Sequence, residues 1–253
     1  PFILRRMKSE VLRELPPKTE NLRRVELETE QRKLYLAAVV DAREKLRAAK
    51  PEDKMTVFAV LMRLREICCD PRLVADNWTG SSAKLEACLE LVTEAVAGGH
   101  RILLFSQFTS MLELLAKRLD EAGVSHFTLQ GSTPKPVRAE QVRRFNQGEA
   151  DVFLISLRAG GTGLNLTAAD IVIHYDPWWN LAAQNQATDR AYRIGQRNPV
   201  QVYKLIAQDT IEEKIVELQQ AKQSLADTVT GGADGAILSM NPEQLLQLLG
   251  EEA

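Results

Sequence analysis

Five short apolar runs alternate with helical patterns between residues 101 and 206, and this alternation restricts the fold more than any other feature. The runs are apolar throughout and rich in β-branched residues, which is typical of strands buried on both faces of a sheet. Parallel strands that alternate with helices form a doubly wound α/β sheet. We expect the strands at 101–106, 126–130, 151–156, 171–175 and 200–206, and the helices between them at 111–122, 137–146 and 182–193.

Helical segments flank this region on both sides. Thr29 is expected to cap a long helix, a second helix follows over 55–68, and a third over 82–97. After the last strand, Thr210 and Glu213 have the spacing of a capping box. The predicted division is a basic N-terminal segment and helical extension (1–80), the sheet domain (81–208), and C-terminal helices with a flexible GGADGA break (209–253).

The composition excludes several classes of protein. With 253 residues, 45% hydrophobic and 26% charged, the chain has an ordinary globular balance. It has no apolar run near the roughly 20 residues of a membrane helix, so no membrane partner is expected. Cys68, Cys69 and Cys88 lack a C-x-x-C spacing, which favours buried thiols over a disulfide or a metal site.

The net charge of -2 conceals an uneven distribution along the chain. Residues 1–24 carry a charge of +4, residues 134–147 and 188–204 carry +3 each, and residues 205–253 carry -7. One such run is usually a solvated helix face. Several basic runs form a phosphate-binding surface only if the fold brings them together.

Polar, glycine-rich or aromatic residues follow four of the predicted strands. In open parallel sheets, ligands bind outside the carboxyl ends of the strands. Backbone amides in glycine-rich turns can donate to phosphate oxygens, and the hydroxyls of Ser132, Thr133 and Ser156 can add to them. These strand-end segments are 106–107, 130–133, 156–163 and 176–180.

The glycine run also invites a rival interpretation as a dinucleotide-binding fingerprint. Gly161 and Gly163 follow a strand, and Asp176 ends the next one. However, Leu166 replaces the third glycine, and the seven residues 164–170 are too few for a crossover helix. The pattern therefore disfavours a nucleotide-dependent dehydrogenase.

The predicted helix over 182–193 contains a sharper signal. Gln186, Arg190 and Arg193 are spaced by four and three residues, which would place them on one helix face. Guanidinium groups stay charged and bind phosphate oxygens bidentately. Two of them on consecutive turns would form a cationic fork suited to a phosphate group.

Eight segments form an ordered set of motifs along the chain, namely PFILRRMKSEV, LPPK, RLREICCDP, ILLFSQFTSMLELL, LQGSTPKPVR, FLISLRAGGTGLNLTAADIVIHYDPWWN, NQATDRAYRIGQ and VYKLIAQDTIEEKI. In this order they resemble the C-terminal RecA-like (helicase C) lobe of a SWI/SNF-type ATPase, in the DNA translocase branch of helicase superfamily two. The resemblance covers residues 1 to about 225 and favours a prokaryotic origin. It implies a RecA-like α/β sheet with an N-terminal helical extension and a C-terminal helical tail.

The resemblance also implies roles for particular residues. Arg190 and Arg193 would be arginine fingers, and Gln186, Gly163 and Asn165 would line the same ATP cleft. The implied DNA-backbone contacts are Gln130, Gly131, Ser132, Thr133, Ser156, Arg158, Gly160, Gly161, Trp178 and Trp179, with one of the two tryptophans expected to face DNA. Three positions depart from the family pattern: Arg158 replaces Lys, Tyr192 replaces His, and Leu181 replaces Pro.

The sequence has no G-x-x-x-x-G-K-[ST] loop to hold the β and γ phosphates. In this family that loop belongs to the first lobe, so the chain alone is expected not to hydrolyse ATP. The expected ligands are ATP and Mg²⁺, held mainly by the first lobe, and the expected partners are double-stranded DNA and that N-terminal RecA-like lobe. We expect a monomer, cytoplasmic and nucleoid-associated in a prokaryote or nuclear in a eukaryote.

Two other functions remain open at this point. The first is a non-catalytic nucleic-acid or protein-binding module that keeps the fold without the motor. The second is a strand-separating helicase or RNA motor of the same superfamily. The DPWWN and DRAYRIGQ segments favour the DNA translocase branch.

Overall fold

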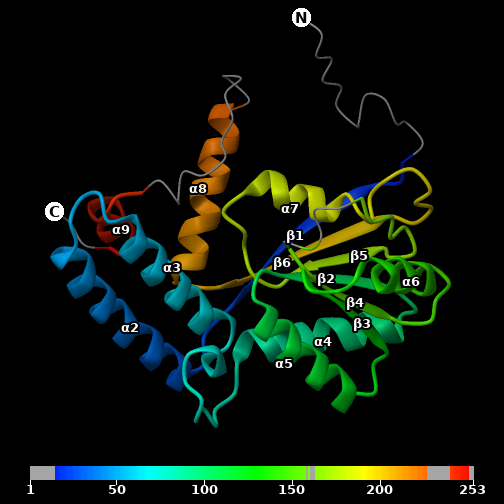
Figure 1. Ribbon diagram of the computed structural model, residues 1–253, viewed down its shortest axis with the longest axis horizontal. Helices are drawn as coiled ribbons and strands as arrows, with labels where there is room; N and C mark the ends of the chain where they lie inside the picture. Colours follow the sequence, from blue (N-terminus) through cyan, green and yellow to red (C-terminus); the bar gives the residue numbers. More distant parts are fainter. Residues whose placement is uncertain (1–14, 158, 160–162, 227–239, 251–253) are drawn as a thin grey trace, which may run out of the picture.

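A six-stranded, all-parallel sheet forms the centre of the computed structural model, which describes residues 15–157, 159, 163–226 and 240–250 (Figure 1). The strand order is β1-β6-β5-β2-β4-β3, so β1 and β3 are the edges. The strands are β1 (Lys18–Val25), β2 (Ile102–Ser106), β3 (His126–Leu129), β4 (Val152–Ser156), β5 (Ile171–His174) and β6 (Val200–Ala207). This arrangement confirms the predicted fold class and the five predicted strands.

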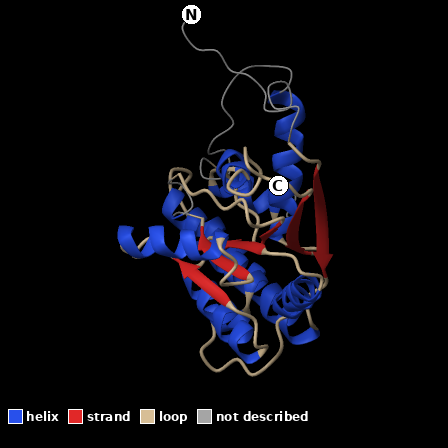
Figure 2. Cartoon of the chain, turned by 90° about the vertical axis from the view of Figure 1, so that its right-hand side faces the viewer, coloured by secondary structure: helices blue, strands red, loops and turns tan. Residues whose placement is uncertain are grey.

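Helices cover both faces of the sheet, as Figure 2 shows. Alternate residues of β2 point to opposite faces, as the two-residue period of a strand requires. Ile102 and Leu104 join the core under α4 (Ala83–Ala97) and α5 (Thr109–Glu121). Leu103 and Phe105 join the core under α6 (Lys135–Asn146) and α7 (Leu181–Thr188). Every residue of β2 and β4 is buried, which explains why these strands read as continuous apolar runs.

Strand β1 was not predicted, although it pairs with β6 along its whole length, from Lys18 beside Val200 to Val25 beside Ala207. Its sequence KTENLRRV has no apolar run, because an edge strand exposes much of its surface. Glu20 binds the ammonium groups of Lys18 at 2.8 Å and Lys204 at 2.7 Å. The segment expected to be an extension of the domain therefore contributes a strand to its sheet.

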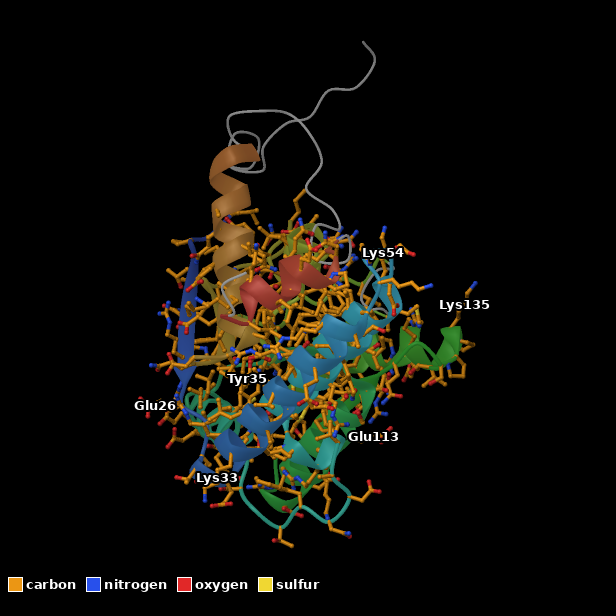
Figure 3. The ribbon with its side chains drawn as sticks, turned by 90° about the vertical axis from the view of Figure 1, so that its left-hand side faces the viewer. Glu26, Lys33, Tyr35, Lys54, Glu113 and Lys135 are labelled. Atoms are coloured by element: carbon orange, nitrogen blue, oxygen red, sulfur yellow. The ribbon has the colours of Figure 1, made fainter. Side chains whose placement is uncertain are left out.

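Four further helices form a separate core beside the sheet. They are α2 (Thr29–Ala48), α3 (Lys54–Cys69), α8 (Ile211–Ala226) and α9 (Pro242–Leu248). Leu46, Leu61, Ile215 and Leu245 are buried together in this core. Tyr35 joins α2 to α8 by accepting a 2.7 Å hydrogen bond from Ile211 N, and Figure 3 places Tyr35 beside the base of α8. The leucine-rich C-terminal segment therefore packs against α2 and α3.

Several element ends differ from the sequence prediction. Glu28, not Thr29, is the residue before α2, and it makes no side-chain cap. Thr210 Oγ1 accepts from Glu212 N, whereas Glu213 reaches back to Asp209 N, so the predicted capping box is shifted. At the start of α9, the side chains of Asn241 and Gln244 form a capping box. The GGADGA break at 231–236 lies outside the described residues, and the domain division at 80 and 208 stays a prediction.

Two fully buried ion pairs join the helices to the sheet domain. Lys84, in the first turn of α4, binds both carboxylate oxygens of Glu212 at 2.6 Å. Arg65 of α3 binds Asp176, which follows β5.

The thiols of Cys68, Cys69 and Cys88 are buried, and burial raises their pKa values. Within the described ranges, each helix is too short or too polar to span a bilayer.

Candidate functional site

The carboxyl ends of the parallel strands meet at one edge of the sheet, where the predicted site residues lie. The ends of β2 and β5 are joined directly there. Ser106 Oγ donates to Asp176 Oδ1 at 2.6 Å, and Gln107 N donates to the same oxygen at 3.2 Å. Asp176 is fully buried. The segments after β2 and β5, which are 70 residues apart in sequence, are therefore one structural unit.

A tight turn follows β3 at this edge. Thr133 N donates to Gln130 O at 3.1 Å, and Thr133 Oγ1 accepts from Gln130 N at 3.0 Å. These bonds leave Gly131 and Ser132 exposed at the tip of the turn. Exposed backbone and hydroxyl groups in a turn of this kind can bind phosphate oxygens.

The loop after β4 is described only in part. Ser156 is buried, and its hydroxyl accepts from Ala159 N at 3.3 Å, so this side chain shapes the loop from within. Arg138 of α6 reaches the loop by donating to Ala159 O at 3.5 Å. The predicted contact residues Arg158, Gly160 and Gly161 lie outside the described residues.

The two adjacent tryptophans diverge into different cores. Trp178 packs against the core under α6 and α7, whereas Trp179 packs against the helical core of α2 and α3. The Trp179 ring lies edge-on to Phe58, with 6.0 Å between the ring centroids. Both indoles are half-buried. Each therefore keeps some surface at the carboxyl edge, and which of them faces DNA stays a prediction.

Arg190 and Arg193 do not lie on a helix, contrary to the sequence prediction. Helix α7 ends at Thr188, and both arginines lie in the turns that follow it. Long-range hydrogen bonds compete with the helix here. Leu166 N donates to Arg190 O at 3.1 Å, and Gln196 Nε2 donates to Ala169 O at 2.7 Å. The segment is therefore folded onto the 164–169 loop instead of continuing as a helix.

The turns nevertheless bring the two arginines to the predicted cleft residues. Arg193 Nη1 donates to Leu164 O at 3.3 Å, next to the exposed Gly163 and Asn165. Gly163 has φ = +32°, in the region that favours glycine. Gln186 remains on α7, with its side chain exposed. The structure thus groups Arg190, Arg193, Gly163 and Asn165, with Gln186 on the adjoining helix.

The Arg190 side chain is buried beside a second positive charge. The residue is only 7% exposed, and its Nε has no hydrogen-bond partner among the described residues. Burial and the neighbouring charge of Arg193 lower the pKa of this guanidinium. A buried cation without full hydrogen bonding costs free energy, and that cost is relieved when an anion binds.

His174, at the end of β5, contacts Thr188, the last residue of α7. Its Nε2 lies 2.9 Å from Thr188 Oγ1, and its ring stacks on Phe105 with 5.6 Å between centroids. Its buried Nδ1 has no partner among the described residues, so we assign the proton to Nε2, which leaves no buried N–H unpaired. Burial lowers the pKa of His174 to about 3. The neutral ring fixes Thr188 two residues before Arg190.

Sequence reasoning assigned no role to Arg65. This residue occupies the apolar stripe of α3 together with Leu61, Leu64 and Cys68, all of which are buried. An arginine within a buried helical stripe indicates a buried partner, and this signal was available in the sequence. The partner is Asp176, at 3.1 Å.

Two family models match the chain. The helicase conserved C-terminal domain matches residues 83–195, and the SNF2-related domain matches residues 1–73. An uncharacterized ATP-dependent helicase of Mycoplasma pneumoniae is 39% identical over 98% of this chain and 24% of the relative. A mouse SWI/SNF-related matrix-associated actin-dependent regulator of chromatin, subfamily A member 1, is 37% identical over 90% of this chain and 23% of the relative.

Solved structures of SWI2/SNF2 ATPases are also similar to this chain. The Sulfolobus solfataricus SWI2/SNF2 ATPase core in complex with double-stranded DNA is 30% identical, with a TM-score of 0.78 over 100% of this chain and 55% of that one. This chain spans about a quarter of the length of the curated relatives it matches. The parallel sheet of this chain and the helices that cover it form a RecA-like lobe of the kind found in that ATPase core. The chain therefore belongs to the SNF2-related helicase family and forms its helicase C-terminal lobe.

Proposed function

We propose that this chain is the C-terminal motor lobe of an ATP-dependent translocase on double-stranded DNA. In this account the nucleotide and Mg²⁺ are held mainly by a first lobe, which carries the phosphate-binding loop that this sequence lacks. The names of the relatives, an ATP-dependent helicase and a SWI/SNF-related regulator of chromatin, support ATP-driven work on DNA. The structure of the Sulfolobus ATPase core in complex with double-stranded DNA supports double-stranded DNA as the proposed substrate.

The observation that carries the proposal is the environment of Arg190. Its guanidinium is nearly buried, is repelled by Arg193, and has an Nε without a partner among the described residues. The backbone bond from Leu166 N to Arg190 O already holds the residue in place. A phosphate oxygen is an acceptor that suits such a group. Arg190 and Arg193 would therefore complete the charge stabilisation of the γ-phosphate when the two lobes close.

The same lobe would grip the DNA backbone at the carboxyl edge of the sheet. The candidate contacts are the exposed tip at Gly131 and Ser132, the loop after Ser156, and one of Trp178 and Trp179. Backbone amides, hydroxyls and positive charge recognise phosphates without reading sequence. Alternate closing and opening of two lobes that both hold DNA would move the protein along it, because hinge closure around a ligand changes the spacing of the lobes.

We expect the full-length natural protein that contains this chain to displace a triplex-forming third strand from duplex DNA, and to do so only when ATP is present. A translocase follows the duplex and removes obstacles without separating its strands. The measurement compares release of a labelled third strand with release of a labelled strand from a forked duplex. Duplex separation would instead support the strand-separating helicase, and release of neither would support the binding module.

A further inference from the structure

The residues Asp176 to Trp179 form a short turn, here called the tryptophan turn, that is fixed by several elements at once. Gln184 of α7 accepts from Trp178 N at 3.2 Å, and Gln219 of α8 donates to Trp178 O. At the start of the turn, Asp176 accepts from Ser106 and from the backbone of the next residue after β2. The backbone of the turn is therefore held from the sheet and from two helices.

Arg65 adds a contact from the helical extension. The side chain is fully buried, and its Nη2 donates both to Asp176 Oδ2 at 3.1 Å and to Pro177 O at 2.6 Å. Its guanidinium carbon lies 4.4 Å from the ring centroid of Trp179 and 5.4 Å from that of Phe108. One side chain thus binds the carboxylate, the backbone and the aromatic ring of the same turn.

We propose that Arg65 is a positioning residue that sets the orientation of the tryptophan turn for its contact with the DNA backbone. This proposal rests on the proposed function, because it assigns Arg65 to the DNA grip of that same lobe. The guanidinium group lies over the indole of Trp179, while its hydrogen bonds hold Asp176 and Pro177. Trp178 and Trp179 pack into different cores, so any rotation of the turn displaces both rings.

An arginine fits this position, because Nη2 makes both hydrogen bonds while the guanidinium carbon lies over the Trp179 ring; Nε and Nη1 have no partner among the described residues. Guanidinium is planar, so it can stack on an indole while it donates in the ring plane, whereas the ammonium group of lysine is a point charge on a flexible stem. Burying an ion pair is costly, and replacing both of its partners with hydrophobic residues of similar volume often leaves a fold equally stable or more stable. A role in orientation explains why a fully buried position on α3 carries this cation.

The first test measures how ATP hydrolysis by the full-length natural protein depends on duplex DNA. For Arg65→Met, we expect the DNA concentration at half-maximal stimulation to rise about tenfold, while the rate at saturating DNA stays within about twofold. Arg65→Lys should fall between Arg65→Met and the natural protein. Leu46→Ala removes packing from the same helical core on α2, so it controls for lost stability and should leave the half-maximal DNA concentration unchanged.

The second test measures tryptophan fluorescence of this 253-residue chain in the absence of DNA. The sequence has three tryptophans, so a Trp78→Phe background restricts the emission to Trp178 and Trp179. In this background, Arg65→Met should change the emission spectrum or its quenching by iodide, and Leu46→Ala should not. An unchanged spectrum in both Arg65→Met and Arg65→Lys would overturn the proposal, and so would equal DNA dependence in Arg65→Met and Leu46→Ala.

The two tests separate this proposal from the proposed function. A spectral change with unchanged DNA dependence shows that Arg65 orients the turn but not for DNA, which overturns the positioning role proposed here. Trp178→Ala and Trp179→Ala then identify the reason. If neither variant alters DNA dependence, the proposed DNA grip of the turn has failed. If one of them does alter it, the grip stands and only the role of Arg65 is lost.

Discussion

Replacing Arg190 with alanine should lower DNA-stimulated ATP hydrolysis by the full-length natural protein by about 10³-fold or more, the range known for arginine fingers. The expected loss follows from the placement of the side chain, which is nearly buried, fixed by its backbone, and short of a partner at Nε among the described residues. Arg193→Ala should act in the same direction. Steady-state hydrolysis at saturating duplex DNA is the measurement.

The chain offers a matched control for this substitution. Arg197 is an exposed arginine seven residues later in the same segment, and Arg197→Ala should retain activity within about twofold, as expected for a surface substitution. Arg190→Lys keeps the charge but loses the bidentate geometry, so most of the loss should persist. If Arg190→Ala and Arg197→Ala hydrolyse ATP at equal rates, the finger assignment is wrong.

Replacing Lys84 with methionine should lower the free energy of unfolding by about 3–5 kcal/mol, the usual cost of removing one partner from a buried ion pair. Lys84 Nζ binds both oxygens of Glu212 at 2.6 Å, and both side chains are fully buried. Glu212 also accepts from Ala207 N, so its carboxylate cannot turn toward solvent without breaking that bond. Urea unfolding of the chain at pH 7 measures the change.

The control for the buried pair removes the stranded charge. The double variant Lys84→Met with Glu212→Gln should recover much of the lost stability, because an amide is cheaper to bury than a carboxylate. At pH 7 the ammonium of Lys84 is fully charged, since its pKa is raised: burial lowers it, but attraction to Glu212 more than compensates. Losses that simply add in the double variant would show that the two side chains are not coupled.

The strands of the sheet were predictable because their signal is local. The runs at 102–106 and 152–156 are apolar at every position, and burial on both faces requires that pattern. Strand β1 escaped because an edge strand can be polar, and its pairing with β6 joins segments about 180 residues apart. The local pattern therefore identifies the centre of the sheet but not its edge.

The candidate site shows the same limit. Strand-end segments were placed at one edge by topology alone, and the bond from Ser106 to Asp176 confirms that two of these ends meet. The end of α7 was misjudged because long-range bonds from Leu166 and Gln196 decide it. The partner of Arg65 lies 111 residues away, so the sequence could indicate a buried partner but could not identify it.

The most direct measurement is ATP hydrolysis by this chain, with and without duplex DNA, before and after it is joined to a first lobe that carries a phosphate-binding loop. The account predicts no hydrolysis by the chain alone, DNA-stimulated hydrolysis by the joined protein, and loss of that activity with Arg190→Ala. Hydrolysis by the chain alone would contradict the account, because the phosphate-binding machinery would then lie within these 253 residues.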